Sequence, residues 1–201
     1  MKRVLSVIAI IGSLVLLSGC DSGVAASIGD TKISQNSVQS RVAEIQTERR
    51  KFDTSGIQLI VGEELNRSEL RFLLISTIFE KLAKQYGIQI TQAMKDARKA
   101  EIYNQIGGIS QLPQALVNAQ IAPSNFDLYV QSILISDALV AKAKADGATD
   151  ETTGSAVQKM VAQLALKEKV RVNPQYGTWD PVNADVITFD PAGTAVKTRN
   201  Q

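Results

Sequence analysis

The single cysteine of this chain, Cys20, ends an apolar stretch and limits how the rest of the chain can be stabilised. Lys2 and Arg3 form a basic start, and the stretch from Val4 to Leu17 is 14 residues long. A helix that spans a membrane needs about 20 apolar residues, so this stretch is too short. With only one cysteine, the chain cannot form an internal disulfide. Its fold must therefore be held together by a hydrophobic core.

The residues around Cys20 have the pattern of a bacterial lipoprotein signal. Leu17-Ser18-Gly19-Cys20 resembles a lipobox, and the polar Asp21-Ser22-Gly23 follows at once. In lipoproteins of this kind the thiol receives a diacylglyceryl group and the chain is cut just before the cysteine. We expect residues 1–19 to be a signal peptide and residues 20–23 a lipidated linker, on the extracytoplasmic face of the cell membrane. An ordinary secretory signal is the alternative interpretation.

Removal of this signal changes the charge on which the choice of partners depends. The full chain has 22 basic and 20 acidic residues, and cleavage removes Lys2 and Arg3 but no acid, which leaves 20 of each. Nucleic-acid binding needs a basic face that neutralises phosphates, so we predict no nucleic-acid partner. No later stretch is long and uncharged enough to span a membrane. The acyl chains on Cys20 are the expected membrane anchor.

The chain has no histidine, which excludes several kinds of chemistry. Ser-His-Asp and Cys-His arrangements cannot form, and zinc sites are usually built from His and Cys. Gly107-Gly108 lacks the spacing and the Lys-Ser/Thr of a phosphate-binding loop. Carboxylate-only chemistry stays open, but the acids alternate with lysines and arginines as on solvated helix faces. We therefore expect no catalytic residue, no metal, no cofactor and no nucleotide.

The mature sequence predicts a mainly α fold whose two ends are joined by a small sheet. Gly29-Asp30 predicts a β-hairpin over Val24–Ile33, and Val170–Val172 predicts a strand that pairs with it. Three-four periodicity predicts the helices. Their expected ranges are 34–51, 66–86, 91–106, 110–120, 124–145 and 155–169. We expect residues 173–201 to be an irregular tail, with Tyr176 and Trp179 fixing it to the domain.

The helix expected over 66–86 is the best marked. Asn66 and Glu69 match a capping box, and Gly87 matches a C-terminal stop. Its apolar residues form two stripes, one of Leu70, Leu74 and Ile78 and one of Phe72, Ile75, Phe79, Leu82 and Tyr86. A helix that is apolar on two sides is either buried on both or offers one side to a ligand. A core helix is the simpler interpretation; the other makes Phe72, Ile75 and Phe79 a peptide-binding stripe.

The order of these elements is similar to that of a known family. Val24–Ser34, with Val38 and Val42 in the next helix, resembles the opening of the N-terminal region of SurA-type periplasmic chaperones and PrsA-type foldases. The return to Val-x-Val-Asn-Pro after the last helix is also similar. Val172–Asp180 resembles the ending of actinobacterial lipoproteins of this superfamily. The resemblance covers roughly Val24 to Asp180 and implies a SurA-N-like helical bundle over residues 24–172.

The family resemblance also shows what this chain lacks. SurA and PrsA carry parvulin prolyl-isomerase domains, whose sites rely on histidine, and this chain has none. What the resemblance implies is the holding module alone, an ATP-independent chaperone for unfolded or newly secreted proteins. The alternative is a structural or adaptor lipoprotein that binds one specific envelope protein. A broad apolar groove beside Phe72–Tyr86 would favour many clients, and a small shape-specific patch would favour one.

The lipid anchor gives the first prediction. Cys20→Ser should release the protein from membranes or leave it as an uncut precursor, because the acyl chains are its expected anchor. Membrane fractionation and mass spectrometry of the protein from its native host measure this. An unmodified Cys20 in the mature protein would contradict the assignment.

Overall fold

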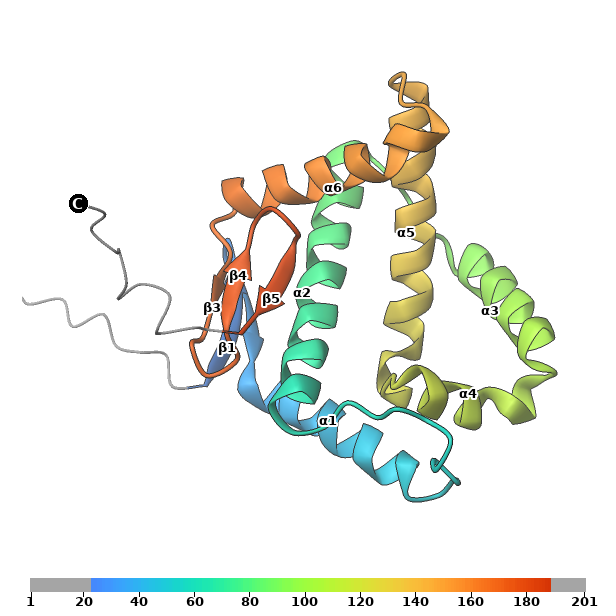
Figure 1. Cartoon of the computed structure of the whole chain (residues 1–201). Coiled ribbons are helices and arrows are strands. Elements are labelled where there is room, and N and C mark those ends of the chain that lie inside the picture. Colours follow the sequence, from blue (N-terminus) through green and yellow to red (C-terminus); the bar gives the residue numbers. More distant parts are fainter. Residues whose placement is uncertain (1–22, 189–201) are drawn as a thin grey trace, which may run out of the picture.

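The computed structural model describes residues 23–188, and this part of the chain is mainly α-helical with two small antiparallel sheets (Figure 1). The fold class expected from the sequence is therefore confirmed. The helices are α1 (Gln35–Arg49), α2 (Gly62–Tyr86), α3 (Gln92–Ile106), α4 (Leu112–Ala119), α5 (Phe126–Ala145) and α6 (Asp150–Lys167). Two short 3₁₀ turns, η1 (Ile109–Gln111) and η2 (Pro123–Asn125), precede α4 and α5.

The larger sheet joins the two ends of the domain. Its strand order is β2-β1-β3, with β1 at Val24–Ile28, β2 at Thr31–Ser34 and β3 at Arg171–Val172. The turn between β1 and β2 is possible because Gly29 adopts a φ of 55°. Ala26 lies opposite Val172 in an antiparallel register. The predicted pairing of the hairpin with the returning strand is thus confirmed.

Several helix ends follow the local sequence signals. The Ser34 side chain accepts a hydrogen bond from the Ser37 N–H at the start of α1, and Thr91 does the same for α3. α2 ends at Gly87, in the left-handed conformation typical of this position. The helix starts expected at residues 34 and 91 and the stop expected at Gly87 are therefore confirmed.

The predicted start of α2 was wrong. The helix begins at Gly62, so Asn66 and Glu69 lie inside it and form no capping box. Both side chains bond to other elements instead: Asn66 accepts from Gln39, and Glu69 accepts from Asn125. Glu63 and Glu64 occupy the first turn, where negative charge is favourable. Contacts with distant elements therefore determine which hydrogen bonds Asn66 and Glu69 accept, and these replace the expected capping bonds.

Two further helix starts differ from expectation. The helix expected from residue 124 begins at Phe126, since Ser124 lies in η2 and its N–H donates to Glu44 on α1 at 3.1 Å. The helix expected from residue 155 begins at Asp150, where Thr149 and Thr152 form a capping box. Residues 150–154, which the expected range left out, therefore form the first turn of α6.

The tail after β3 is more ordered than the sequence suggested. β4 (Thr178–Asp180) and β5 (Asp185–Ile187) form an antiparallel hairpin, so the expectation of an irregular tail is wrong there. Tyr176 is buried, and Trp179 and Val186 also pack on the core, as expected for the two aromatics. The expectations for residues 189–201 and for Cys20 fall outside the described residues.

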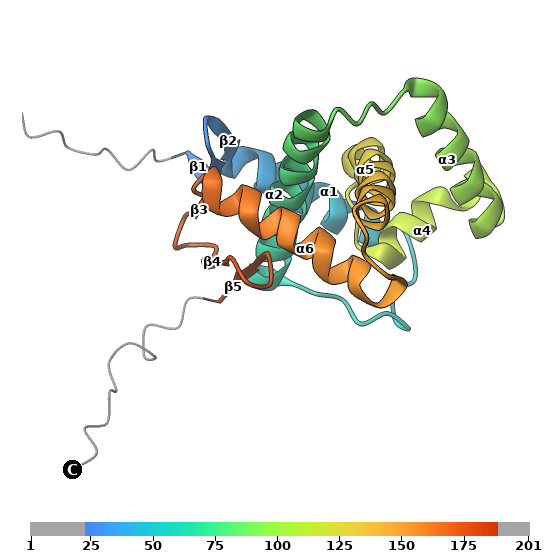
Figure 2. The same ribbon diagram turned by 90° about the horizontal axis from the view of Figure 1, so that it is seen from above.

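The core is built around α2, which lies between the sheets and α5 in both views (Figures 1 and 2). Leu70, Leu74 and Ile78 are completely buried. The first half of α2 packs with α1, β1 and Tyr176, and the second half packs with α5 and α6. α3 and α4 lie on the other side of α5 and share a smaller cluster with it.

The position of Tyr176 gives the second prediction. Tyr176→Ala should lower the free energy of unfolding by about 3–5 kcal/mol, because it leaves a cavity where an almost fully buried ring lies. Val182→Ala is the matched control in the same tail, since its side chain is 73% exposed, and it should change stability by no more than about 0.5 kcal/mol. Urea unfolding measures both. Equal effects would show that the ring contributes no core contact.

Candidate functional site

A groove of about 440 Å³ lies between α2 and α5. The sequence-predicted residues Phe72, Ile75 and Phe79 line one wall and are half-buried. The opposite side is lined by Tyr129 and Ile133 of α5 and by Ile121 from the segment after α4. The structure thus brings the three predicted side chains together along one open, mostly apolar groove.

Small side chains keep this groove open. Ser76 of α2 and Ser132 of α5 both line it, and their hydroxyl oxygens are 3.0 Å apart in a hydrogen bond. Ser68 and Ser136 line the same space. Larger apolar side chains at these positions would fill the gap, as they do at other helix contacts in the core. The serines therefore leave room between two helices that are otherwise closely packed.

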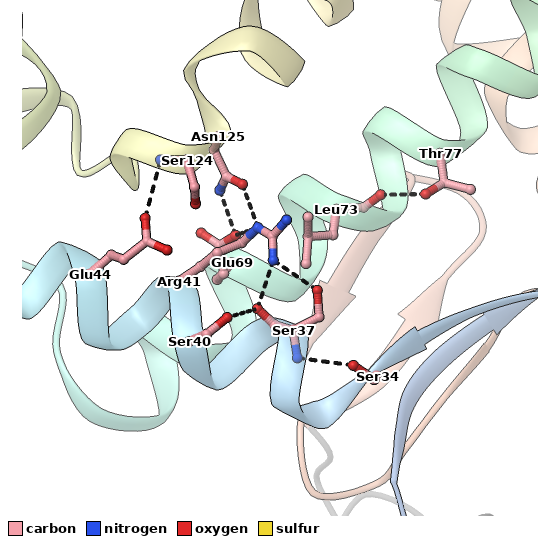
Figure 3. Close-up of polar contacts among 10 residues, drawn as sticks. All are labelled: Ser34, Ser37, Ser40, Arg41, Glu44, Glu69, Leu73, Thr77, Ser124 and Asn125. Carbon is pink, nitrogen blue, oxygen red and sulfur yellow. Dashed lines mark hydrogen bonds and ion pairs between the residues drawn. The ribbon is translucent and has the colours of Figure 1, made fainter.

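Glu69 and Asn125 line the groove and form a polar cluster with Arg41 of α1, whose contacts Figure 3 shows. The Asn125 amide donates to Glu69 Oε1 at 2.6 Å, and the Nε of Arg41 donates to Asn125 Oδ1 at 2.6 Å. Arg41 Nε also lies 3.9 Å from Glu69 Oε1. These residues belong to α1, α2 and η2, so the cluster fixes three elements beside the groove. We call Arg41, Glu69 and Asn125 the polar cluster.

Burial dominates the electrostatics of this cluster. It raises the pKa of Glu69 above the usual value, while the hydrogen bond from Asn125 and the charge of Arg41 oppose that rise. Glu69 is only 4% exposed, and Asn125 is 1% exposed. The carboxylate stays tolerable in the interior because it accepts a hydrogen bond and lies near a cation.

The rest of the predicted stripe does not reach the groove. Leu82 is buried and joins the cluster that α2 forms with α5 and α6. Tyr86 is half-buried, and the Lys142 Nζ lies 5.0 Å from the centre of its ring, a cation–π contact. Of the five stripe residues, only the three singled out for peptide binding therefore line the groove.

The sequence analysis did not single out the opposite wall. Tyr129 and Ile133 are four residues apart on α5, as are Ser132 and Ser136, so each pair lies on one face of the helix. This alternation of large apolar and small polar residues was the available signal. Nothing local showed that this face of α5 would lie opposite Phe72 and Phe79.

No metal or membrane-spanning feature occurs in the part of the chain that the structure describes. Between residues 23 and 188, no group of three or more His, Cys, Asp or Glu side chains could hold a metal ion. Within the same range, every helix is too short or too polar to cross a bilayer.

No family model, curated protein or solved structure matches this chain. The resemblance to SurA-type and PrsA-type proteins, and the function that it implies, therefore stay predictions.

The buried carboxylate gives the third prediction. A carboxyl group whose folded-state pKa is raised binds its proton more tightly in the folded state, so its contribution to stability falls as pH rises above 4.5 toward the raised value. Glu69→Gln keeps an acceptor for Asn125 and removes this titration. The free energy of unfolding of the variant should therefore rise relative to that of the wild type as the pH increases from 4 to 7.

Thermal unfolding at several pH values measures that difference. The control is Glu64→Gln, an exposed glutamate in the first turn of the same helix. Loss of its favourable charge should cost about 0.3–1 kcal/mol, which is opposite in sign to the gain expected for Glu69→Gln. If the difference between wild type and Glu69→Gln were the same at every pH, the assignment of a raised Glu69 pKa would be wrong.

Proposed function

We propose that this protein is a membrane-anchored, ATP-independent holding chaperone that binds unfolded or newly secreted polypeptides outside the cytoplasmic membrane. Cys20 carries the lipid, and the groove between α2 and α5 receives apolar side chains of the client. The protein holds its clients without chemical turnover and without a cofactor.

The observation that carries this proposal is the groove itself. Phe72, Ile75 and Phe79 line it in the folded chain and are only half-buried, although neighbouring apolar residues of α2 are completely buried. A concave apolar site with a few polar groups at its edge is the usual form of a binding site. Hydrophobic contact depends little on direction, so such a surface suits clients of varied sequence.

The size of the groove favours the adaptor as a second candidate. A volume of about 440 Å³ is near the lower end of the range for small-molecule pockets, about 300–1,000 Å³. Such a space takes a few side chains, and the polar cluster gives its lining a fixed hydrogen-bonding pattern. Both features suit one specific envelope partner. Binding of several unrelated unfolded proteins with similar affinity would favour the chaperone over the adaptor.

The fourth prediction compares two isoleucines of α2. Ile75 lines the groove and Ile78 is completely buried in the core. Ile75→Ala should weaken client binding by about five- to thirtyfold, since apolar contact area is lost, with a modest loss of stability. Ile78→Ala should lower the free energy of unfolding by about 2–5 kcal/mol and leave client affinity unchanged once the protein is folded.

The measurement is suppression of aggregation of an unrelated unfolded protein by the soluble form lacking residues 1–20. Affinity and melting temperature are determined for both variants, at a temperature where each is folded. Phe72→Ser and Phe79→Ser extend the test along the same wall. If the groove variants lost stability but kept full affinity, the groove would be part of the core and clients would bind elsewhere.

A further inference from the structure

A surface patch separate from the groove lies where the end of α6 meets β3 and β4. A shallow depression of about 480 Å³ is lined there by Leu166, Lys169, Arg171, Trp179 and Pro181. We call these five residues the basic–apolar patch. Leu166 is 64% exposed, and Lys169 and Arg171 are also exposed. The patch therefore offers a large apolar side chain and two cations to whatever lies outside it.

The two cations of this patch have no side-chain partner within residues 23–188. Two other basic residues that contact acids of this part of the fold are paired: Lys81 contacts Glu168 at 2.9 Å, and Arg71 contacts Asp185 at 3.3 Å. The side chains of Lys169 and Arg171 form neither an ion pair nor a hydrogen bond with the described part of the chain. Glu168, the acid next to Lys169, pairs with Lys81, and Asp180 accepts hydrogen bonds from Val182 and Asn183. Neither acid pairs with Lys169 or Arg171, so both cations remain available to an external anion.

The start of the described chain lies beside this patch. The Asn173 amide donates to the Val24 carbonyl at 3.1 Å, and Arg171 lies opposite Ser27 in the sheet. Cys20 precedes Val24 by four residues, which span at most about 14 Å when fully extended. A lipid on Cys20 would therefore hold the bilayer surface close to β1 and β3. Figure 1 shows these strands at the end of the molecule opposite α3 and α4.

We propose that the basic–apolar patch docks on the anionic surface of the membrane that holds the lipid anchor; this inference depends on the proposed lipidation of Cys20. Lys169 and Arg171 contact headgroup phosphates, and Leu166 enters the interface. Trp179 stays packed on the domain with its indole N–H buried, and its partly exposed ring lines the patch beside these residues, close to the docked bilayer. A short lipid tether and a weakly basic surface then give the protein a fixed orientation that neither would give alone.

Trp179 is the single tryptophan of the chain and reports on this contact directly. The full-length lipidated protein is inserted through its anchor into vesicles of brominated phosphatidylglycerol or brominated phosphatidylcholine. Bromine should quench Trp179 fluorescence strongly in the anionic vesicles and weakly in the zwitterionic ones. Lys169→Glu with Arg171→Glu should lower the ratio of docked to undocked protein by at least roughly 25-fold, because the loss of each basic residue near an anionic surface costs about fivefold and the new carboxylates are repelled as well.

Two further variants separate charge at the patch from charge in general. Lys84→Glu with Lys95→Glu changes the net charge by the same amount as the patch variant, but on α2 and α3. It should leave the quenching of Trp179 unchanged. Lys169→Arg with Arg171→Lys keeps both charges and should quench like the wild type. Anchored protein whose Trp179 is not quenched, or equal loss in both charge-reversed variants, overturns the docking proposal alone. A chain that does not float with the vesicles lacks the anchor, which overturns the proposed lipidation and the docking together.

Discussion

Burial of α2 on two sides is the constraint on which the rest of the fold depends. One stripe, Leu70, Leu74 and Ile78, is completely inaccessible, and each such side chain gains about 1.5–3 kcal/mol relative to exposure. α1 and the sheet around β1 cover the first half, and α5 and α6 cover the second half. A 25-residue helix buried in this way serves as the support against which the other elements are placed.

The groove exists because this packing is incomplete at one place. Beside the groove, α2 and α5 meet through Ser76 and Ser132, whereas Ile78 and Leu82 pack against α5 further along. The polar cluster links α1, α2 and η2 by hydrogen bonds beside the groove. These hydrogen bonds offset part of the cost of burying Glu69. A stable core and an open apolar wall therefore occur on a single helix, with small side chains setting the boundary between them. The arrangement keeps Phe72 and Phe79 accessible without loosening the core beneath them.

The sequence predicted those features whose cause is local. Gly29, Ser34 and Gly87 each determine a turn or a helix end within a few residues, and the structure confirms them. The helices followed from periodicity for the same reason. Asn66 and Glu69 were misinterpreted because a polar residue near a helix start can bond either to its own backbone or to a distant partner. That choice depends on tertiary contacts, which no local pattern contains. The β4–β5 hairpin was missed because its strands are three residues each and carry little alternation.

One wall of the candidate groove could be predicted from the sequence and the other could not, because only the first depends on a local pattern. The wall on α2 could be found because three large apolar residues repeat on one face, but the wall on α5 required knowledge of which helices are neighbours. The sheet also brings together parts of the chain that are far apart in sequence.

Because β1 pairs with β3, the residues after α6 come to lie beside the residues that follow Cys20. Any tether at Cys20 therefore acts on the β1–β3 end of the fold, while α3 and α4 extend from the opposite side of α5. The pairing of two very short strands thus determines which end of a helical protein a lipid anchor would hold near the membrane.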